Sequence, residues 1–516
     1  MNLKETVIGI ELGSTRIKSV LLNKNNEVMA SGSFTWENNL VDGIWTYSLD
    51  EVRNGLQSCF SELKKDVYDK YGIMLTTTGA LGVSAMMHGY LPFDKDDKQL
   101  CAFRTWRNTM TAEAAEKLTN LFEFNIPQRW SIAHLYQAIL NKESHVQQIS
   151  YITTLAGYVH YTLTGKKVMG IGEASGMFPI DSETNQFDAE MVRKFNDLTG
   201  LDLLSMLPEV LPAGVEAGHL TEAGALYLDP AGVLEAGIPL VPCEGDAGTG
   251  MTATNSIRVY TGNVSAGTSD FAMVVVDKKL KVHREIDMVT TPSGKPVAMV
   301  HCNNCTSDIN AWVNLMKENL NLFGLEVDSN TLYTKLFQIA LAGEPFCGDL
   351  LSYNYYSGEG VTDLDEGRLL FLRKADSRFT LANFMRTHLY SALATLKIGM
   401  DILAEEQVTI EKIYGHGGFF KTPEVGQRML SAAINTPVSV MKTAGEGGPY
   451  GMALLCAFSL WKEEGESLED YLDSKVFNDF ESSTVMADQA EADGFNHFIE
   501  SYKKCLPVEK TAVERF

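Results

Sequence analysis

The chain has 516 residues, which is enough for two large domains, since a domain usually has roughly 50–250 residues. Apolar residues make up 45% and charged residues 21%, which is ordinary for a globular protein and excludes disordered, collagen-like and coiled-coil chains. With 43 basic and 66 acidic residues the net charge is −23, which disfavours nucleic acid and anionic membranes as partners. Small anions are still allowed, because a few backbone amides and a metal ion can bind a nucleotide locally.

The first elements predicted along the chain are three short strands joined by tight turns. Apolar and β-branched runs at Val7–Ile10, Ile17–Leu22 and Val28–Ala30 are typical of strands. Gly13-Ser14-Thr15 separates the first two strands, and an Asn-rich turn separates the second from the third. We therefore expect an antiparallel meander in which a small-residue turn joins two strands, whereas the usual phosphate loop joins a strand to a helix.

The remainder of the first half alternates helices with buried strands. Ser48 and Glu51 form the pattern of a capping box, which predicts a helix directly after Ser48. Further predictions are a strand at Gly79–Met86 and helices at Ala112–Phe122, Ala133–Leu140 and Tyr151–Leu163. The Gly- and Pro-rich stretch Leu203–Pro239 is typical of surface connections.

The pattern restarts after about residue 255. Gly267-Thr268-Ser269 comes just before the apolar strand Phe271–Val276, in the way that the Gly13–Thr15 turn precedes the second strand. The elements predicted downstream are a long helix at Leu381–Ala404, a strand ending at Tyr414, a glycine turn, a helix at Val425–Ile434 and a strand at Val438–Met441. The sequence therefore predicts an α/β protein of two related domains, residues 1–255 and 256–516.

Three turns rich in Gly, Ser and Thr are the candidate phosphate-binding elements. They are Gly13-Ser14-Thr15, Gly267-Thr268-Ser269 and Gly415-His416-Gly417-Gly418. Glycine lets backbone N–H groups converge on one point, and Ser and Thr hydroxyls add donors. A single turn of this kind is usually only a turn, but its repetition in both halves favours a clamp for a polyphosphate. No GxxxxGK[ST], strict GxGxxG or HExxH motif accompanies them.

The cysteines and the amino terminus bear on location. Eight cysteines are too few for a disulfide scaffold, and MNLKETVIGIELG lacks the regions of a signal peptide, so we expect a reducing cytoplasm. The most apolar stretches are too short to span a bilayer. Cys302-Asn303-Asn304-Cys305 has no second pair, and zinc normally takes four ligands, so we interpret these residues as ordinary thiols and not as a zinc or redox site.

Six segments between Val7 and Ser459 together resemble the FGGY family of carbohydrate kinases, within the actin-like ATPase superfamily. In chain order they are VIGIELGSTRIKSVLL, SAMMHGYLPFD, EGDAG, SAGTSDF, YGHGGFFKTPEVGQRML and TAGEGGPYGMAL. They are similar to the opening phosphate hairpin DLGTSxxK, the QMHG stretch of xylulokinases, the catalytic GGDN segment, the second phosphate motif LGTSG, the adenosine-side GGGAxS and the closing GPALGAA. Single motifs are weak, but the ordered set is specific.

The resemblance implies two ribonuclease-H-like domains flanking a deep cleft, with sugar on the N-terminal domain and ATP mainly on the C-terminal one. The implied reaction transfers the γ-phosphoryl group of ATP, with Mg²⁺, to a primary hydroxyl. The residues implied to bind ATP are Gly13, Ser14, Thr15, Lys18, Gly267, Thr268, Ser269, Gly417, Gly418 and Phe419. Lys18 is equally well read as an exposed strand lysine.

Asp246 matches the family's catalytic aspartate and would accept the hydroxyl proton, as phosphoryl transfer needs one base. Its alternative role is to cap a helix that begins near Ala247. Asp246 and Glu11 are implied to hold magnesium. Glu11 departs from the family's usual aspartate, and its longer reach suits a magnesium ion that keeps several waters.

The resemblance assigns the sugar pocket to Met87, His88, Trp106 and Arg107, with Asp246 at the reacting hydroxyl. The alternative for His88 and Trp106 is a place in the core. Trp106-Arg107-Asn108 replaces the commoner pattern WxDxR, which predicts a different selection of hydroxyls. The stretch Glu173–Gly176 resembles the family's DAAGT stretch and is expected to form a structural wall.

The expected acceptor is a ketopentose, with D-xylulose favoured by Met87-His88-Gly89 and L-ribulose close behind. His134 stands where the family's first signature has lysine, which weakens assignment to a standard subfamily. Two other hypotheses are a non-metabolic actin-like ATPase and a catalytically lapsed regulator that binds sugar. A filament protein would not need Asp246 together with the sugar-pocket residues. The family also suggests a homodimer.

Overall fold

The computed structural model describes residues 2–441, 447–478 and 482–516. The chain forms two compact units. Unit 1 consists of Met1–Ile257, Asp287–Val297 and Glu446–Asp479, and unit 2 consists of Arg258–Ile286, Ala298–Gly445 and Phe480–Phe516. The first crossing lies two residues from the predicted boundary at 255. The chain later returns to unit 1 twice, at Asp287–Val297 and at Glu446–Asp479, and no local pattern in the sequence predicts these returns.

The sheet of unit 1 has the strand order β13-β6-β1-β2-β3. Its strands are β1 (Thr6–Leu12), β2 (Arg16–Asn23), β3 (Val28–Thr35), β6 (Ala80–Ala85) and β13 (Glu244–Gly245). β1 is antiparallel to β2, β2 is antiparallel to β3, and β1 is parallel to β6. The predicted meander is confirmed, and its register places Glu11 opposite Lys18.

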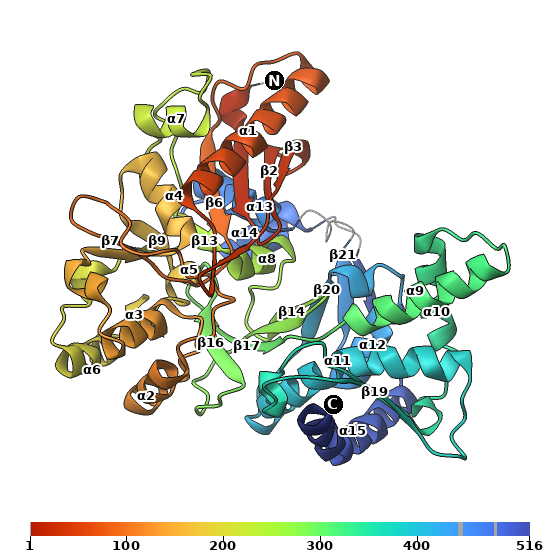
Figure 1. The fold of residues 1–516 in the computed structure, drawn as a ribbon. Helices are drawn as coiled ribbons and strands as arrows, with labels where there is room; N and C mark the ends of the chain where they lie inside the picture. Colours follow the sequence, from red (N-terminus) through yellow and green to blue (C-terminus); the bar gives the residue numbers. More distant parts are fainter. Residues whose placement is uncertain (1, 442–446, 479–481) are drawn as a thin grey trace. The chain divides into compact units, whose positions relative to one another are not determined.

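Helices cover both faces of this sheet. α1 (Leu49–Tyr71) begins with the predicted capping box between Ser48 and Glu51 and packs against β3. α13 (Gly447–Trp461) packs against β1 and against α8 (Asp246–Ala253), and Figure 1 shows it in blue among the red and orange strands. The helix approaches β1 closely, because a Cβ built on Gly9 would lie 2.1 Å from the Pro449 carbonyl oxygen. Small residues therefore bring α13 onto the strand that leads into the first turn.

Shorter elements complete unit 1. The strands are β4 (Asn39–Val41), β5 (Ile44–Thr46), β7 (Leu91–Phe93), β8 (Tyr151–Thr153), β9 (Val168–Gly170), β10 (Ile180–Asp181), β11 (Gln186–Phe187) and β12 (Glu209–Leu211). The helices are α2 (Ala112–Phe122), α3 (Ser131–Leu140), α4 (Leu155–Thr164), α5 (Ile171–Ala174), α6 (Ala189–Thr199), α7 (Glu222–Leu228) and α14 (Leu468–Tyr471).

The predicted helix over Tyr151–Leu163 is wrong at its start. Residues 151–153 form β8, and α4 begins only after Thr154. The Thr154 hydroxyl accepts a hydrogen bond from the Gly157 amide and so caps the helix. The same apolar run therefore supplies a strand and a helix.

The second sheet has the order β16-β17-β15-β14-β20-β21-β22. Its strands are β14 (Thr261–Ala266), β15 (Asp270–Val275), β16 (Ile286–Thr290), β17 (Pro296–Cys302), β20 (Lys412–His416), β21 (Val438–Met441) and β22 (Ser482–Val485). β14 and β15 form an antiparallel hairpin, and β14 is parallel to β20. In this sheet β15, β14 and β20 are neighbours in the same way as β2, β1 and β6 in unit 1. In each case two antiparallel hairpin strands are followed by a strand that is parallel to the first strand of the hairpin.

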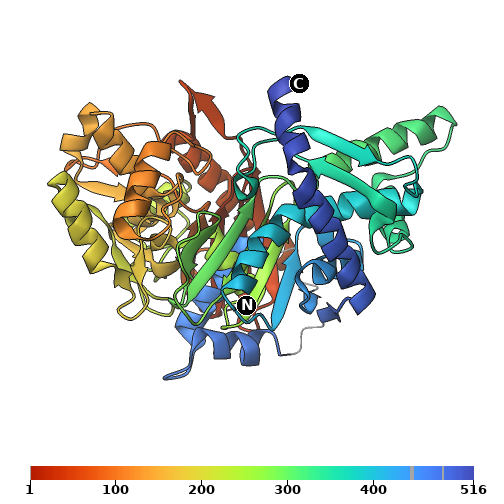
Figure 2. The same ribbon diagram turned by 90° about the horizontal axis from the view of Figure 1, so that it is seen from below.

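The helices of unit 2 are α9 (Ser307–Leu322), α10 (Ser329–Ala340), α11 (Leu381–Glu405), α12 (Val425–Ile434) and α15 (Gln489–Arg515). A separate hairpin joins β18 (Leu350–Asn354) to β19 (Leu369–Arg373). α15, the long dark blue helix of Figure 2, packs against α12 and β18. The bounds predicted for α12 and β21 match the structure.

Candidate active site

The Gly13–Thr15 turn joins β1 to β2 and directs its carbonyl groups into the protein. The carbonyl oxygen of Gly13 accepts from the Trp36 indole (2.7 Å), and that of Ser14 accepts from the Tyr47 hydroxyl (2.6 Å). The Thr15 carbonyl accepts from the Trp36 amide (3.2 Å). The amides of Ser14 and Thr15 donate to no residue that the structure describes. These N–H groups are therefore available to an anion.

The Gly267–Ser269 turn joins β14 to β15 in the same manner. The Gly267 carbonyl accepts from the Thr306 amide (3.0 Å) and hydroxyl (2.6 Å), and the Thr268 carbonyl accepts from the Cys305 amide (2.9 Å). Among the described residues, the amides of Thr268 and Ser269 find no acceptor. The two hairpins thus present the same unused donors, each within its own unit.

The third glycine turn lies beside the second, at the end of β20. Gly417 has φ +98°, and a Cβ there would lie 2.4 Å from the Ala266 carbonyl oxygen, so only glycine fits. Gly418 has open space around its Cα. The Phe419 side chain is fully buried, so this residue can border a ligand only through its backbone.

Asp246 is the first residue of α8, with Gly245 as the N-cap. Its carboxylate accepts a hydrogen bond from the Met87 amide (3.1 Å). The side chain is solvent-accessible, yet the surrounding protein excludes enough water to raise its pKa to about 6, against the opposing effect of the nearby amides. Asp246 is therefore ionised at neutral pH. Because Gly245 is the N-cap and no side chain caps α8, the alternative that Asp246 serves as the helix cap is wrong.

Glu11 lies at the end of β1, between the turn and the start of α13. Burial, followed by the charge of Asp246, raises its pKa to about 7, and Lys18 opposes the shift. A Cβ on Gly448 would lie 1.3 Å from the Glu11 carboxylate, so glycine at this position makes room for the carboxylate. Gly448 lies in the GGPYG segment, the local signal from which its proximity to the site could have been predicted.

Two buried carboxyl groups, those of Glu244 and Glu173, lie close to Asp246. Glu244 accepts from the amides of Gly172 (3.3 Å) and Glu173 (2.9 Å), and burial raises its pKa to about 8. Burial raises the pKa of Glu173 well above its usual range, partly offset by the Thr154 hydroxyl and reinforced by Asp246. A Cβ on Gly245 would lie 2.5 Å from the Glu173 carboxylate. Glu173 thus packs against the backbone next to Asp246, as expected of a structural wall.

The predicted sugar-pocket residues lie in unit 1, but they are not equally accessible. Met87 and His88 are 6% and 5% exposed. His88 has φ +72°, its Nδ1 lies 3.1 Å from the Gly176 carbonyl oxygen, and its ring stacks on Trp130. Trp106 donates its indole N–H to the Ser14 hydroxyl (3.2 Å), and Arg107 is exposed. Trp106 therefore supports the phosphate turn in addition to any contact with sugar.

Comparison with known proteins identifies the family. Residues 6–252 match the N-terminal domain, and residues 262–460 the C-terminal domain, of the FGGY family of carbohydrate kinases. The chain belongs to this family. The predicted resemblance and the two-domain actin-like α/β fold are confirmed, and the chain is a phosphotransferase that acts on an alcohol group. Kinases of this family use ATP.

Individual relatives are distant. Xylulose kinase of Haemophilus influenzae is 22% identical over 96% of this chain and 98% of its own length. Among solved structures, ligand-bound xylulose kinase from Lactobacillus acidophilus has a TM-score of 0.79 at 16% identity, covering 98% of both chains. Gluconate kinase from the same organism has a TM-score of 0.78 at 16% identity, also covering 98% of both chains. This likeness shows the fold and leaves the acceptor sugar of the kinase undecided.

Two further groups that the sequence draws attention to in this kinase are His134 and the pair Cys302 and Cys305. His134 is fully buried, and burial lowers its pKa to about 3, so the ring is neutral where the family has a lysine. Cys302 and Cys305 are buried free thiols, and the described residues contain no group of three His, Cys, Asp or Glu side chains that could hold a metal.

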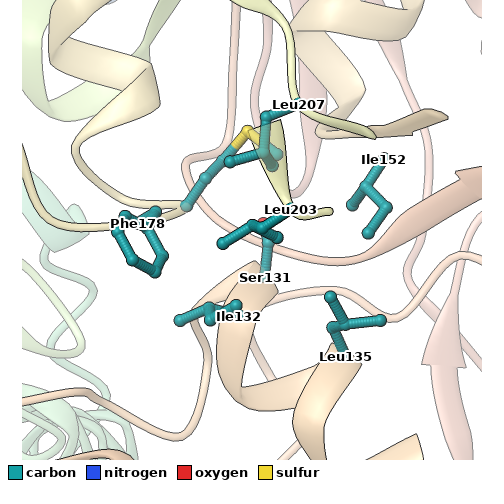
Figure 3. A pocket seen from close by; sticks show the side chains of 8 residues that line it. Ser131, Ile132, Leu135, Ile152, Phe178, Leu203 and Leu207 are labelled. Carbon is teal, nitrogen blue, oxygen red and sulfur yellow. The ribbon is translucent and has the colours of Figure 1, made fainter. Parts of the chain in front are cut away.

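A small pocket between α3 and the Leu203–Leu207 segment is unsuited to a sugar. Apart from Ser131 its lining is apolar, and Figure 3 shows Ile132, Leu135, Ile152 and Phe178 around it. The Ser131 hydroxyl already donates to the Gly89 carbonyl. A sugar needs several polar partners, so this pocket of the kinase is a packing gap. No helix in the described part of the chain is long and apolar enough to cross a membrane.

Proposed function

We propose that this kinase transfers the γ-phosphoryl group of ATP to a primary hydroxyl of a ketopentose, D-xylulose or L-ribulose. The observation that carries the proposal is the pair of hairpin turns with unused amides, one of them in the same unit as Asp246. The turns supply phosphate donors, and Asp246 supplies the base. We further assign sugar binding to unit 1 and most of the nucleotide contacts to unit 2, at Gly267–Ser269 and Gly417–Phe419.

In the proposed reaction Asp246 removes the proton of the acceptor hydroxyl. The resulting oxygen nucleophile forms a bond to the γ-phosphorus, the bond from that phosphorus to the β–γ bridging oxygen breaks, and ADP leaves. The Met87 amide holds the Asp246 carboxylate in place. The amides of Ser14 and Thr15, with the Lys18 ammonium, offset the charge on the phosphoryl oxygens.

Magnesium fits the carboxylates that are present. Glu11 and Asp246 are near enough for the charge of one to raise the pKa of the other, and Mg²⁺ typically takes one or two carboxylates together with substrate phosphates and water. A site of two protein ligands agrees with the absence of any larger ligand group among the described residues. Glu11 and Asp246 would hold the ion, which would neutralise charge on the β- and γ-phosphates.

The choice of a ketopentose rests on the Met87-His88-Gly89 stretch and on relatives named xylulose kinase. The similar structural match to a gluconate kinase makes the acceptor the first point to test. The eight free cysteines suit the proposed cytoplasmic location.

The test is a coupled ADP-release assay with pentuloses, hexuloses, polyols and sugar acids. We expect D-xylulose or L-ribulose to stimulate ADP release above the basal rate. Asp246→Asn should abolish sugar-dependent turnover and keep binding of the non-hydrolysable ATP analogue AMP-PNP, because the substitution removes the base and preserves the shape. Basal ATPase with no stimulating acceptor would instead support an actin-like ATPase. Sugar binding without turnover would support a lapsed regulator.

A further inference from the structure

Arg107 is an exposed arginine that makes no ion pair with any carboxylate in the described part of the chain. Its guanidinium carbon lies 4.3 Å from the centre of the Trp45 ring and 6.0 Å from that of Trp106. By contrast, Arg104 and Arg129 are each paired with a carboxylate. Attraction between the guanidinium and the aromatic rings holds Arg107 without a carboxylate partner. Stacking leaves the N–H edges of the guanidinium available for a ligand.

The backbone beside Arg107 is fixed by the strand β5. The Asn108 side chain accepts from the Trp45 amide (2.9 Å) and donates to the carbonyls of Trp45 (2.8 Å) and Thr105 (2.9 Å). Asn108 is 3% exposed, so its amide is used in holding the turn and does not select sugar hydroxyls. The departure from the WxDxR pattern therefore leaves Arg107 as the outward-facing polar group of this turn.

Two contacts of neighbouring residues connect the segment around Arg107 to the Gly13–Thr15 turn. Its neighbour Trp106 donates to the Ser14 hydroxyl (3.2 Å), and the Tyr47 hydroxyl donates to the Ser14 carbonyl (2.6 Å). The positive charge of Arg107 also lowers the pKa of that same Tyr47 hydroxyl, against the larger effect of burial. All these residues belong to unit 1. Arg107 therefore directly follows a residue that contacts the Gly13–Thr15 turn, and its charge reaches the Tyr47 hydroxyl that contacts the same turn.

We propose that Arg107 binds the transferred phosphoryl group, first as the γ-phosphate of ATP and then as the phosphate of the product, and does not bind a sugar hydroxyl. This inference rests on the proposed kinase reaction and gives Arg107 a role other than the sugar contact expected from its sequence. The guanidinium is a planar fork of N–H donors with no acceptor, which matches two phosphate oxygens at once. Trp45 orients the fork, and the amides of the Gly13–Thr15 turn bind the remaining oxygens.

The deciding experiment compares binding of AMP-PNP and ADP to the full-length protein by calorimetry in the presence of Mg²⁺. Arg107→Gln should weaken AMP-PNP binding by roughly 10- to 100-fold, the usual effect of losing a hydrogen bond between charged groups. ADP binding should change less than about twofold, because ADP has no γ-phosphate. Arg107→Lys should show an intermediate loss, since it keeps the charge and loses the fork.

Arg193→Gln is the matched control, because it removes the same charge from an exposed pair with Asp197. It should leave the binding of both nucleotides unchanged. Equal binding of AMP-PNP to wild type and Arg107→Gln would overturn the proposal. An effect of Arg107→Gln confined to the KM for the acceptor would overturn it as well, and would assign Arg107 to the acceptor.

The nucleotide comparison needs no acceptor sugar, so it separates the two proposals. If no sugar stimulates turnover but AMP-PNP and ADP still respond differently to Arg107→Gln, the acceptor assignment fails and the role of Arg107 stands. If a ketopentose is phosphorylated but both nucleotides bind the variant normally, the kinase assignment stands and the role of Arg107 fails.

Discussion

The Gly13–Thr15 and Gly267–Ser269 hairpin turns present the same donors to a ligand but are held in place by different groups. In the Gly13–Thr15 turn the carbonyls of Gly13 and Ser14 are held by the side chains of Trp36 and Tyr47. In the Gly267–Ser269 turn the corresponding donors are mainly backbone amides, from residues 305 and 306. In both turns the carbonyls face the protein and the following amides stay unused. The presentation of donors is therefore common to both units, while the residues that maintain it differ.

The charged groups around the two turns differ as well. Beside the first turn are Glu11, Lys18 and Asp246, which are accessible to a ligand at least in part, and the pKa values of Glu11 and Asp246 are raised to about 7 and about 6. Directly after the second turn, Asp270 is fully buried, and burial and the nearby Glu359 raise its pKa well above the usual range. This difference supports the proposal that Asp246, beside the first turn, is the catalytic base and that the second turn only binds phosphate.

The largest expected loss of activity comes from Gly448→Ala, a substitution beside the Gly13–Thr15 turn. The new Cβ would occupy the position of the Glu11 carboxylate, so Glu11 must move from the site. We expect kcat/KM to fall by about 100-fold or more, in line with the loss of a group that stabilises the transferring phosphate. Gly360→Ala is the control, because a Cβ there meets nothing within 4 Å. Normal activity of Gly448→Ala at an unchanged Tm would show that Glu11 is dispensable.

The pH dependence of kcat/KM tests whether Asp246, beside the first turn, is the catalytic base. Asp246 must be ionised to accept a proton, and its pKa is raised to about 6. The kcat/KM should therefore fall as pH decreases through about 6 and approach a tenfold loss per pH unit below that. Because Glu11 and Asp246 interact, the acid limb reports the pair, and bound magnesium should move it to lower pH. A profile with no acid limb at any pH at which the enzyme stays folded would contradict the assignment of Asp246 as the base.

A matched pair of substitutions tests the difference in support. Trp36→Phe removes the indole donor to the Gly13 carbonyl and leaves that carbonyl without its side-chain partner. Thr306→Val removes the hydroxyl donor to Gly267 but keeps the backbone amide bond. We expect the KM for ATP to rise roughly 3- to 10-fold for Trp36→Phe and less than about twofold for Thr306→Val. Equal effects would mean that the two turns are supported alike.

The sequence was sufficient where the signal is local. The capping box at Ser48, the helix at Val425–Ile434 and both hairpin turns depend on neighbouring residues, and the structure agrees with them. The contact between Glu11 and Gly448 joins opposite ends of the chain, and no local pattern predicts it. The break after β8 was missed because apolar periodicity alone does not distinguish a buried strand from the helix that follows it.

The supports of the site were also missed. Trp36 and Tyr47 are ordinary aromatic residues in the sequence, and their role appears only when their donors meet the carbonyls of the first turn. Glu173 was recognised as a wall, but its contact with the backbone at Gly245 depends on the packing of α5 against β13. Motifs identify residues that a ligand touches, whereas the residues that hold a motif in place follow from tertiary packing.

The smallest change in activity is expected for Asp270→Asn, directly after the Gly267–Ser269 turn. Asp270 has no hydrogen-bond partner among the described residues apart from its own backbone, and burial, followed by the charge of Glu359, raises the pKa of its carboxyl group well above the usual range. Because its folded pKa is raised above the unfolded value of 3.8, its ionisation in the unfolded chain costs stability as pH rises above that value. Asparagine removes this cost, so the Tm of the variant should exceed that of wild type by a margin that grows from pH 5 to pH 8. The kcat and the KM for ATP should change less than about twofold. A large loss of activity at unchanged Tm would instead show that the charge of Asp270 takes part in catalysis or in ATP binding. The two turns would then not differ in the way described above.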